Sequence, residues 1–304
     1  MTAAVQKILS HYSYESPAVR ARLAQLLYQG VLGGTGRLMI SAVDQGFEHG
    51  PIDSFEMQPE AYDPCFHFRF AYENRLSGLS GPLGFLQAGV DLYPGQLPLI
   101  LKMNSSNKLV DMDDPDQAVT ACIEDALHLG CAAIGFTIYP GSNASLSQFQ
   151  ELQELSAEAR SCGLAVIVWS YPRGNLSTEG ETSIDTVSYG AHMACLLGAH
   201  IVKVKIPSSA VATQKSKELL SKSKADLTQL DERIAFVKRA CFANRRLVIF
   251  SGGAIKSDAD LISEVQAIHA GGGDGSIIGR NIFQRPETEA KALVQKLTAI
   301  YCSK

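Results

Sequence analysis

The sequence predicts an α/β protein built on a closed (β/α)8 barrel, a TIM barrel, with an N-terminal helical extension. From residue 38 onward, short runs of β-branched and other apolar residues alternate with helix-length amphipathic segments. Eight such runs can be counted, and parallel strands need crossover helices between them. A length of 304 residues also fits one large barrel. Eight repeated units favour the closed barrel over an open, doubly wound sheet.

The predicted strands are short and largely apolar, and only the second is weakly marked. They lie at residues 37–43, 76–80, 97–103, 132–138, 164–170, 200–206, 246–252 and 275–279. The predicted helices follow them at residues 114–130, 145–163, 186–199, 225–243, 257–273 and 286–301. In the first helix, Ala118, Cys122 and Ala126 recur at helical spacing, and Gly130 stands where glycine favours a helix end.

The predicted organisation consists of an N-terminal extension and a barrel that carries one polar insertion. Residues 1–36 form the N-terminal extension, in which one amphipathic helix at 17–29 is expected to cover the bottom or side of the barrel. Residues 37–304 form the barrel, which is the expected catalytic domain. The Ser/Lys-rich stretch 207–229 is too polar for the core, so we expect a solvated helical insertion there. A mobile cover over the site is the alternative.

Composition excludes several classes of function. The net charge of −4 is spread without basic blocks, whereas nucleic-acid binding needs clustered Lys and Arg, so no nucleic-acid partner is expected. Seven cysteines, an odd number without a CxxC pair, favour a reduced, cytoplasmic location. No run of about 18 apolar residues occurs, so no association with a membrane is expected. The seven histidines show no ligand spacing, so no metal site is expected.

The stretch HIVKVKI, residues 200–206, places two lysines inside an apolar strand. Alternate residues of a barrel strand point inward, so Lys203 and Lys205 share the barrel side while Val202 and Val204 face the helices. An ammonium group held away from water has a lowered pKa, and a neutral amine attacks carbonyls. The pattern therefore indicates Schiff-base chemistry, with an ion-paired structural lysine as the alternative.

Other strand ends carry further candidates, because the carboxyl ends of barrel strands bear the active site. Asp44 follows the first strand as a candidate active-site acid or a loop cap. Trp169 and Tyr171 share one parity at the end of the fifth strand, followed by Arg173 in the loop. The phenol could exchange protons, whereas the indole could shield an iminium or simply fill the core. Lys102 is an inward candidate that could pair with Asp44.

Glycine-rich loops end the last two strands, in IFSGGAIKS and GGGDGSIIGRN. Barrels of this type often bind phosphate there through backbone N–H groups, and Arg280 could add a bidentate contact. Glycines also end strands for steric reasons, so each loop alone is a weak indication. Their pairing at neighbouring strands predicts a phosphate site.

The motifs VDQGFEHGP, LILKMN, GFTIYPGS, VWSYPRG, HIVKVKIP, SGGA and IIGRNIFQR occur in this order. Over residues 30–300 the chain thereby resembles the class I fructose-bisphosphate aldolases of the archaeal and bacterial type. The resemblance implies a (β/α)8 barrel and a lyase without cofactor or metal, commonly a homo-oligomer. Its implied reaction is the reversible cleavage of fructose 1,6-bisphosphate to dihydroxyacetone phosphate and glyceraldehyde 3-phosphate, in glycolysis or gluconeogenesis.

The resemblance also implies roles for individual residues. Lys203 matches the Schiff-base lysine, Tyr171 the proton-transfer tyrosine and Asp44 the active-site aspartate. Residues expected to contact substrate are Trp169, Lys102, Arg173 and Lys205. The phosphate-binding segments contain Ser251, Gly252, Gly253, Gly279 and Arg280.

Three other functions share some of these features. A related lysine-dependent aldolase or transaldolase would act on another phosphorylated sugar or a ketoacid. A flavin- or phosphate-binding barrel oxidoreductase would share the glycine loops but would not need Lys203. A non-catalytic phosphosugar-binding protein would bind the substrate without turnover.

Overall fold

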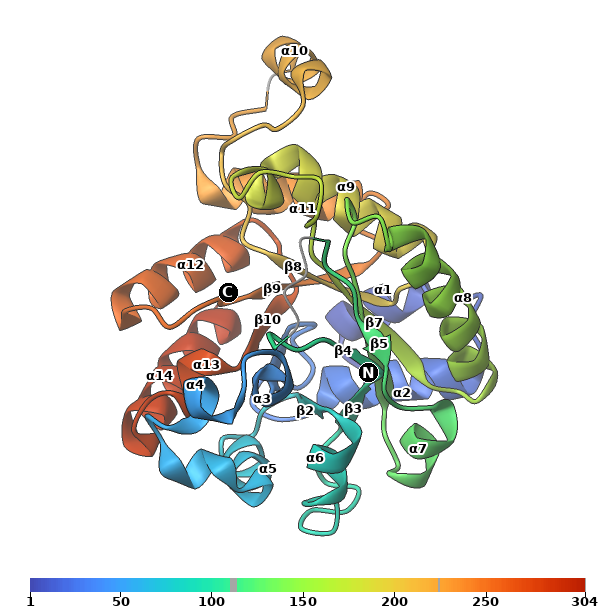
Figure 1. Ribbon diagram of the computed structural model, residues 1–304, viewed down its shortest axis with the longest axis vertical. Helices are drawn as coiled ribbons and strands as arrows, with labels where there is room; N and C mark the ends of the chain where they lie inside the picture. Colours follow the sequence, from blue (N-terminus) through green and yellow to red (C-terminus); the bar gives the residue numbers. More distant parts are fainter. Residues whose placement is uncertain (110–113, 224, 304) are drawn as a thin grey trace.

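Eight parallel strands close into a barrel in the computed structural model, which describes residues 1–109, 114–223 and 225–303 (Figure 1). Each strand pairs with its neighbour in chain order, and the last pairs with the first. The strands are β1 (Leu38–Ala42), β2 (Gly78–Gly81), β3 (Leu99–Lys102), β6 (Ala133–Ile138), β7 (Ala165–Ser170), β8 (Ile201–Lys205), β9 (Leu247–Ser251) and β10 (Gly275–Ile278). The predicted (β/α)8 barrel is confirmed, with all eight strands where the sequence indicates them.

Helices surround this barrel in Figure 1. They are α5 (Pro64–Glu73), α6 (Leu83–Gln87), α7 (Ile123–His128), α8 (Ser145–Ser161), α9 (Ile184–Leu196), α11 (Leu230–Ala240), α12 (Asp258–Ala270) and α14 (Glu287–Cys302). Short helices follow strands β1, β7 and β10: α3 (Gln45–Glu48), α4 (Pro51–Phe55), η1 (Pro59–Tyr62), η2 (Gly180–Thr182) and α13 (Arg280–Phe283). In the part of the chain that the structure describes, no helix has the length and apolar character needed to span a bilayer.

Alternate residues of β8 face opposite sides of the barrel wall, as the sequence pattern predicts. Val202 and Val204 belong to the large core between the strands and the surrounding helices. Ile201 packs instead in a second cluster inside the barrel, with Ile167 of β7 and Ile249 of β9. Lys203 and Lys205 therefore point toward the barrel axis, where their burial has to be compensated.

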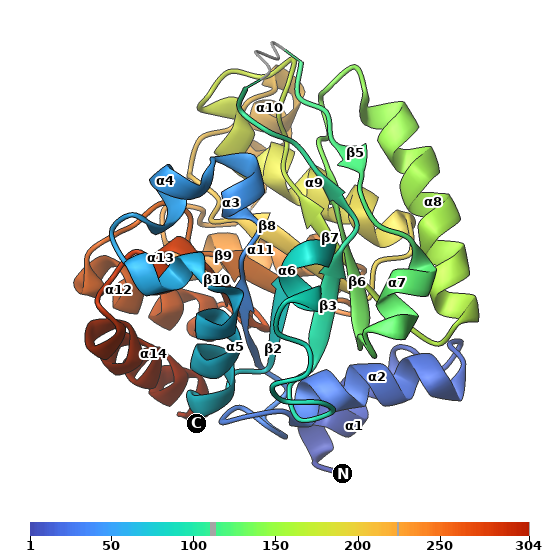
Figure 2. The ribbon, with the colours of Figure 1, turned by 60° about the horizontal axis from the view of Figure 1, so that its bottom comes forward.

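Two helices, rather than the one predicted, lie at the amino-terminal end of the barrel. Figure 2 shows α1 (Ala3–Ser10) and α2 (Pro17–Tyr28) next to the strand ends farthest from α3 and α10. The predicted helix at 17–29 is α2, which packs against β7. Helix α1 was not predicted because it spans only eight residues, of which Val5 is buried and Ile8 and Leu9 are partly buried against the same cluster.

Residues 114–130 do not form the predicted single helix. Only α7 is helical, and Ala118–Val119 forms strand β5, which pairs antiparallel with β4 (Asn104–Ser105). Gly130 adopts a positive φ of 66° just after the helix, as expected for a glycine at this position. The prediction for residues 114–122 was therefore wrong, and the one for the helix end was right.

The polar insertion contains helix α10 (Gln214–Lys222), which has no buried residue. Figure 1 shows α10 standing apart from the helices that surround the barrel. Its base is fixed by Asp185, whose carboxylate accepts the backbone N–H groups of Ala212 (2.8 Å) and Thr213 (3.0 Å). The expected solvated helix is present, although position 224 of the predicted insertion lies outside the described residues.

Candidate active site

A cavity of about 440 Å³ opens at the carboxyl ends of strands β1, β7, β8, β9 and β10. Of the residues predicted for the site, all but Trp169 and Lys102 line it, namely Asp44, Tyr171, Arg173, Lys203, Lys205, Ser251, Gly252, Gly253, Gly279 and Arg280. Residues that the sequence analysis did not single out for the site also contribute, among them Glu48, His49 and Lys256. Cationic side chains outnumber carboxylates in this lining, which suits an anionic ligand.

Lys203 is the most desolvated amine of the cavity. It is 6% exposed, and its Nζ lies 5.3 Å from the centre of the Trp169 ring and 5.5 Å from that of Tyr171. Burial lowers the pKa of Lys203 to about 8, and the cations Lys102 and Arg280 act in the same direction while Asp44 and Glu48 oppose it. About a tenth of the Lys203 amines are therefore neutral at pH 7, against fewer than about one in a thousand for an ordinary lysine, and the neutral amine is the form that attacks a carbonyl.

Lys205 lies on the same face of β8 but has a different environment. Its Nζ donates to Oε2 of Glu181 at 2.8 Å, and both side chains are about one quarter exposed. Glu181 belongs to the short helix η2, which follows β7. One of the two inward lysines is thus ion-paired near the rim, whereas Lys203 forms no ion pair with any described residue.

Asp44 and Glu48 bring two carboxylates to the cavity. Asp44 lies after β1 and directly precedes α3. Its side chain makes no capping hydrogen bond, so the alternative role as a loop cap is wrong. Burial raises the pKa of Glu48, and the neighbouring Asp44 carboxylate raises it further. Residues four apart lie on the same side of a helical turn, which is why α3 directs both groups to one place.

Tyr171 and Arg173 approach from the end of β7. Burial raises the pKa of Tyr171 well above its ordinary value, and Asp44 and Glu48 add to this effect. The Arg173 guanidinium lies 5.8 Å from the centre of the Tyr171 ring, and 5.1 Å from that of Tyr139. Tyr171 is therefore a neutral phenol near neutral pH, able to donate a proton or a hydrogen bond.

Trp169 and Lys102 lie below the cavity rather than in its wall. Trp169 is 1% exposed, and it fits because position 135 is glycine: a Cβ at Gly135 would lie 2.3 Å from the indole ring. Lys102 is fully buried, and its Nζ donates to the side chains of Asn104 (3.2 Å) and Gln117 (3.1 Å) and to the Asn104 carbonyl. The expected direct pairing of Lys102 with Asp44 is therefore wrong.

The two glycine loops lie side by side, after β9 and β10. Asn281 joins them, because its Oδ1 accepts the Lys256 N–H at 2.9 Å and its Nδ2 donates to the Ala254 carbonyl at 3.0 Å. Gly253 has a φ of 70°, and a Cβ at Gly279 would lie 2.4 Å from the Ala42 carbonyl oxygen. The backbone conformation at Gly253 and the close packing at Gly279 thus both favour glycine. The absence of a side chain also lets an anion approach the backbone at both positions.

Comparisons with known proteins agree with this geometry. The model of the DeoC/LacD family aldolases matches residues 38–285. A class 1 fructose-bisphosphate aldolase of Halobacterium salinarum is 32% identical over 255 residues, which cover 84% of this chain and 87% of the relative. The barrel, the inward lysines and these matches define an aldolase, an aldehyde-lyase.

Solved structures extend the likeness to three dimensions. An archaeal fructose-1,6-bisphosphate aldolase, with its catalytic lysine covalently bound to the carbinolamine intermediate of the substrate, is 30% identical with a TM-score of 0.72. That match covers 87% of this chain and 95% of the other. The fructose-bisphosphate aldolase from Slackia heliotrinireducens is 28% identical, covers 95% and 92%, and has a TM-score of 0.79. The chain belongs to the DeoC/LacD aldolase family.

Proposed function

We propose that this protein is a class I, Schiff-base aldolase that reversibly cleaves fructose 1,6-bisphosphate to dihydroxyacetone phosphate and glyceraldehyde 3-phosphate. The observation that carries the proposal is the buried amine of Lys203, whose pKa is lowered to about 8, at the floor of a cavity rich in cations. The names of the relatives support the choice of substrate. The expected cytoplasmic location and homo-oligomeric state belong to the same proposal.

The reaction begins at the C2 ketone of the open-chain sugar. The neutral amine of Lys203 attacks C2, and loss of water gives an iminium. The iminium accepts the electron pair released when the C3–C4 bond breaks, so glyceraldehyde 3-phosphate leaves and an enamine remains on the lysine. Lys203 lies close to the Trp169 ring, which limits access of water from below.

Tyr171 relays the proton in this scheme. The C4 hydroxyl loses its proton as the bond breaks, and C3 of the enamine gains one afterward. Because the raised pKa keeps Tyr171 a neutral phenol, its hydroxyl gives its own proton to a carboxylate of the cavity, Asp44 or Glu48, as it takes the proton of the C4 hydroxyl. The same route in reverse delivers a proton to C3 of the enamine. Asp44 orients the sugar hydroxyls, and hydrolysis of the second iminium by water releases dihydroxyacetone phosphate and regenerates the amine.

The cations and glycine loops hold the phosphates. Ser251 ends β9 and is followed by Gly252 and Gly253, while Arg280 begins α13 and is preceded by Gly279. Backbone N–H groups at such loops bind phosphate, and a guanidinium adds a bidentate contact. Arg173 and Lys205 line the same cavity and would receive the other end of the substrate. Lys102 acts indirectly in this scheme, because it is buried below the cavity.

Covalent trapping tests the proposal. Borohydride in the presence of dihydroxyacetone phosphate is expected to reduce the imine and add a triose phosphate to the peptide that contains Lys203. The matched variants are Lys203→Met and Lys205→Met, which remove neighbouring lysines of one strand face. The adduct and the activity should vanish in Lys203→Met, and the adduct should persist in Lys205→Met. Absence of any adduct on the wild-type protein would refute the imine.

The choice of substrate is tested separately. Cleavage of fructose 1,6-bisphosphate should exceed that of other phosphorylated ketoses by at least about tenfold in kcat/KM. A higher value for another sugar phosphate or for a ketoacid would instead favour the related aldolase or transaldolase. Activity should survive EDTA, since the proposed chemistry resides in an amine. Loss of activity on chelation would contradict that route.

A further inference from the structure

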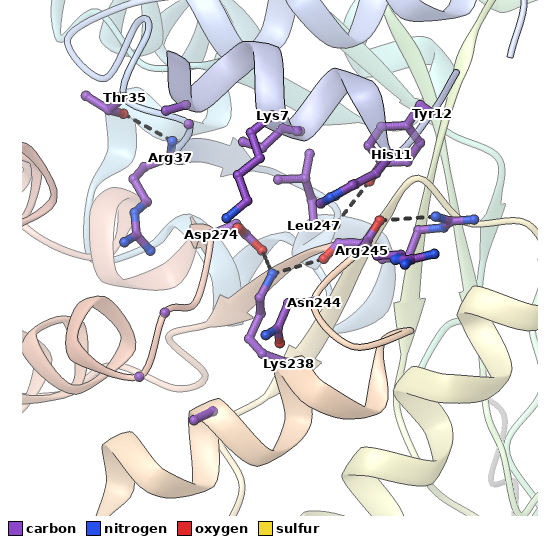
Figure 3. Close-up of a pocket in the computed structure, with 17 residues that line it drawn as sticks. Lys7, His11, Tyr12, Thr35, Arg37, Lys238, Asn244, Arg245, Leu247 and Asp274 are labelled. Carbon is purple, nitrogen blue, oxygen red and sulfur yellow. Dashed lines mark hydrogen bonds and ion pairs between the residues drawn. The ribbon is translucent and has the colours of Figure 1, made fainter. Parts of the chain in front are cut away.

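A second cavity lies at the opposite end of the barrel from the active site. It measures about 320 Å³ and lies between α1, α11 and the loops that lead into β1, β9 and β10. Figure 3 shows the residues from these separate segments that line it. The proposed aldolase reaction uses none of them.

Positive charge dominates this second cavity. Its lining contains five cationic side chains and a single carboxylate, that of Asp274. The cations are Lys7, Arg37, Lys238, Arg245 and Arg246. The whole protein carries a net charge of −4, so this concentration runs against the average. Gathering like charges costs free energy unless an anion offsets their repulsion.

The one carboxylate is already engaged. Asp274 pairs with Lys238, and its Oδ2 also accepts the backbone N–H of Val248 at 2.7 Å. Lys7 and Arg245 form no ion pair within the described residues, and both are exposed. Their charges are therefore available to a ligand from solution.

The pKa of His11 reflects the positive electrostatic potential of this second cavity. Burial lowers the pKa of His11, and four cations of the same cavity lower it further, in the order Arg245, Lys7, Lys238 and Arg246. Arg37 and Asp274 are the other charged groups in the lining. A neutral imidazole among these cations marks a positive potential that an anion would relieve.

The loop that presents two of the cations has an unusual backbone. Phe242, Ala243 and Asn244 all have positive φ values, of 56°, 53° and 69°. Each left-handed residue other than glycine costs about 1–2 kcal/mol, and such residues seldom follow one another. The turn brings Arg245 and Arg246 to the cavity immediately before β9. Strain of this kind is typical of binding sites.

We propose that this cavity binds a small, multiply charged anion of the phosphate-ester or pyrophosphate class. Its limited volume fits a metabolite-sized molecule rather than a nucleic-acid strand. The site also adjoins the framework of the barrel, because Tyr12 in its lining donates to the His200 carbonyl (2.6 Å) and accepts the Leu247 N–H (3.1 Å). These contacts join the starts of β8 and β9, the strands that end in Lys205 and Ser251.

Calorimetric titration with inorganic pyrophosphate tests the site. The background variant is Arg280→Ala, which weakens anion binding at the active-site cavity. In this background, one binding event is expected to remain, at the second cavity. The double variant Lys7→Ala/Arg245→Ala should weaken this binding by at least about tenfold, since two charge-assisted contacts are lost. The matched control is Lys215→Ala/Lys217→Ala, which removes the same charge from exposed positions of α10. Equal weakening in both double variants would overturn the proposal, as would absence of binding in the background variant.

Histidine NMR locates the anion independently. Pyrophosphate should raise the pKa of His11 because it offsets the surrounding cations. In the Arg280→Ala background the pKa of His49, which lines the active-site cavity, should stay constant. A shift at His49 without one at His11 would place the anion at the active site alone and contradict the inference.

Discussion

Two lysines on one face of β8 show how much a single residue's environment decides. The period of two in the strand predicts that both point inward, and they do. It cannot predict that Glu181 neutralises Lys205, because Glu181 belongs to η2, a helix of three residues that is too short to show a periodic pattern. The sequence therefore predicted the pair, whereas only the structure separates the desolvated amine from the ion-paired one.

The pH dependence of catalysis belongs to Lys203. We expect kcat/KM for cleavage to rise with pH through an inflection near pH 8, because imine formation needs the neutral amine. The Asp44 carboxylate raises the pKa of Lys203, so Asp44→Asn should move the inflection to lower pH while reducing the rate. Initial rates measured from about pH 6 to 10 would show both effects. An inflection that moves upward in Asp44→Asn would contradict this assignment.

The same lowered pKa implies that Lys203 reduces stability. The unfolded chain binds this proton more tightly than the folded one, so wild-type stability rises with pH between about 8 and 10.4. Below pH 8 the penalty is present in full. Lys203→Met should therefore increase the free energy of unfolding at pH 7 by about 1–3 kcal/mol, a gain that disappears near pH 10.4.

Urea unfolding at the two pH values measures this difference. The control is Lys205→Met, which removes a partly exposed ion pair worth about 0–1 kcal/mol and should not stabilise the protein. Equal stability of Lys203→Met and wild type at both pH values would show that the buried ammonium carries no penalty.

Among the elements, the hairpin of β4 and β5 replaced a predicted helix. Ala118, Cys122 and Ala126 have helical spacing, but they are small residues whose burial contributes little to a helix. Gln117 has a stronger requirement, since its side chain contacts Lys102, Tyr139 and Glu48 beneath the active site. Tertiary contacts of this kind override local periodicity and cannot be read from spacing.

Gln117→Leu tests the role of this hairpin. The change removes an acceptor from the buried Lys102 ammonium and a donor to the Tyr139 hydroxyl (2.7 Å). We expect a loss of about 1–3 kcal/mol in the free energy of unfolding, because buried polar groups lose their partners. The control is Gln150→Leu, where the glutamine is exposed and donates only to Glu154 of the next helical turn. Similar losses in both variants would contradict the role of Gln117.

At the scale of the whole molecule, the barrel was predictable because all eight strands repeat one pattern. At the amino-terminal end, α2 was predicted as the helix at 17–29, but α1 was not, because its eight residues are too few for a clear periodic pattern. Its contribution comes just after the helix, where Tyr12 is fully buried between β8 and β9, and Glu15 pairs with Arg160 at 2.8 Å. The extension thus ties the start of the chain to strands about 190 and 235 residues later.

The variant Tyr12→Phe tests how much these hydrogen bonds between the N-terminal extension and the barrel contribute to stability. The variant keeps the ring but leaves the His200 carbonyl and the Leu247 N–H without their buried partner, at a cost of about 1–3 kcal/mol. In a protein of this size the melting temperature should fall by a few degrees. Tyr14→Phe is the matched control, because Tyr14 is 55% exposed and its hydroxyl only accepts from Arg246 (2.9 Å). If both variants have the melting temperature of the wild type, the amino-terminal extension does not stabilise the barrel, and strand pairing alone keeps it closed.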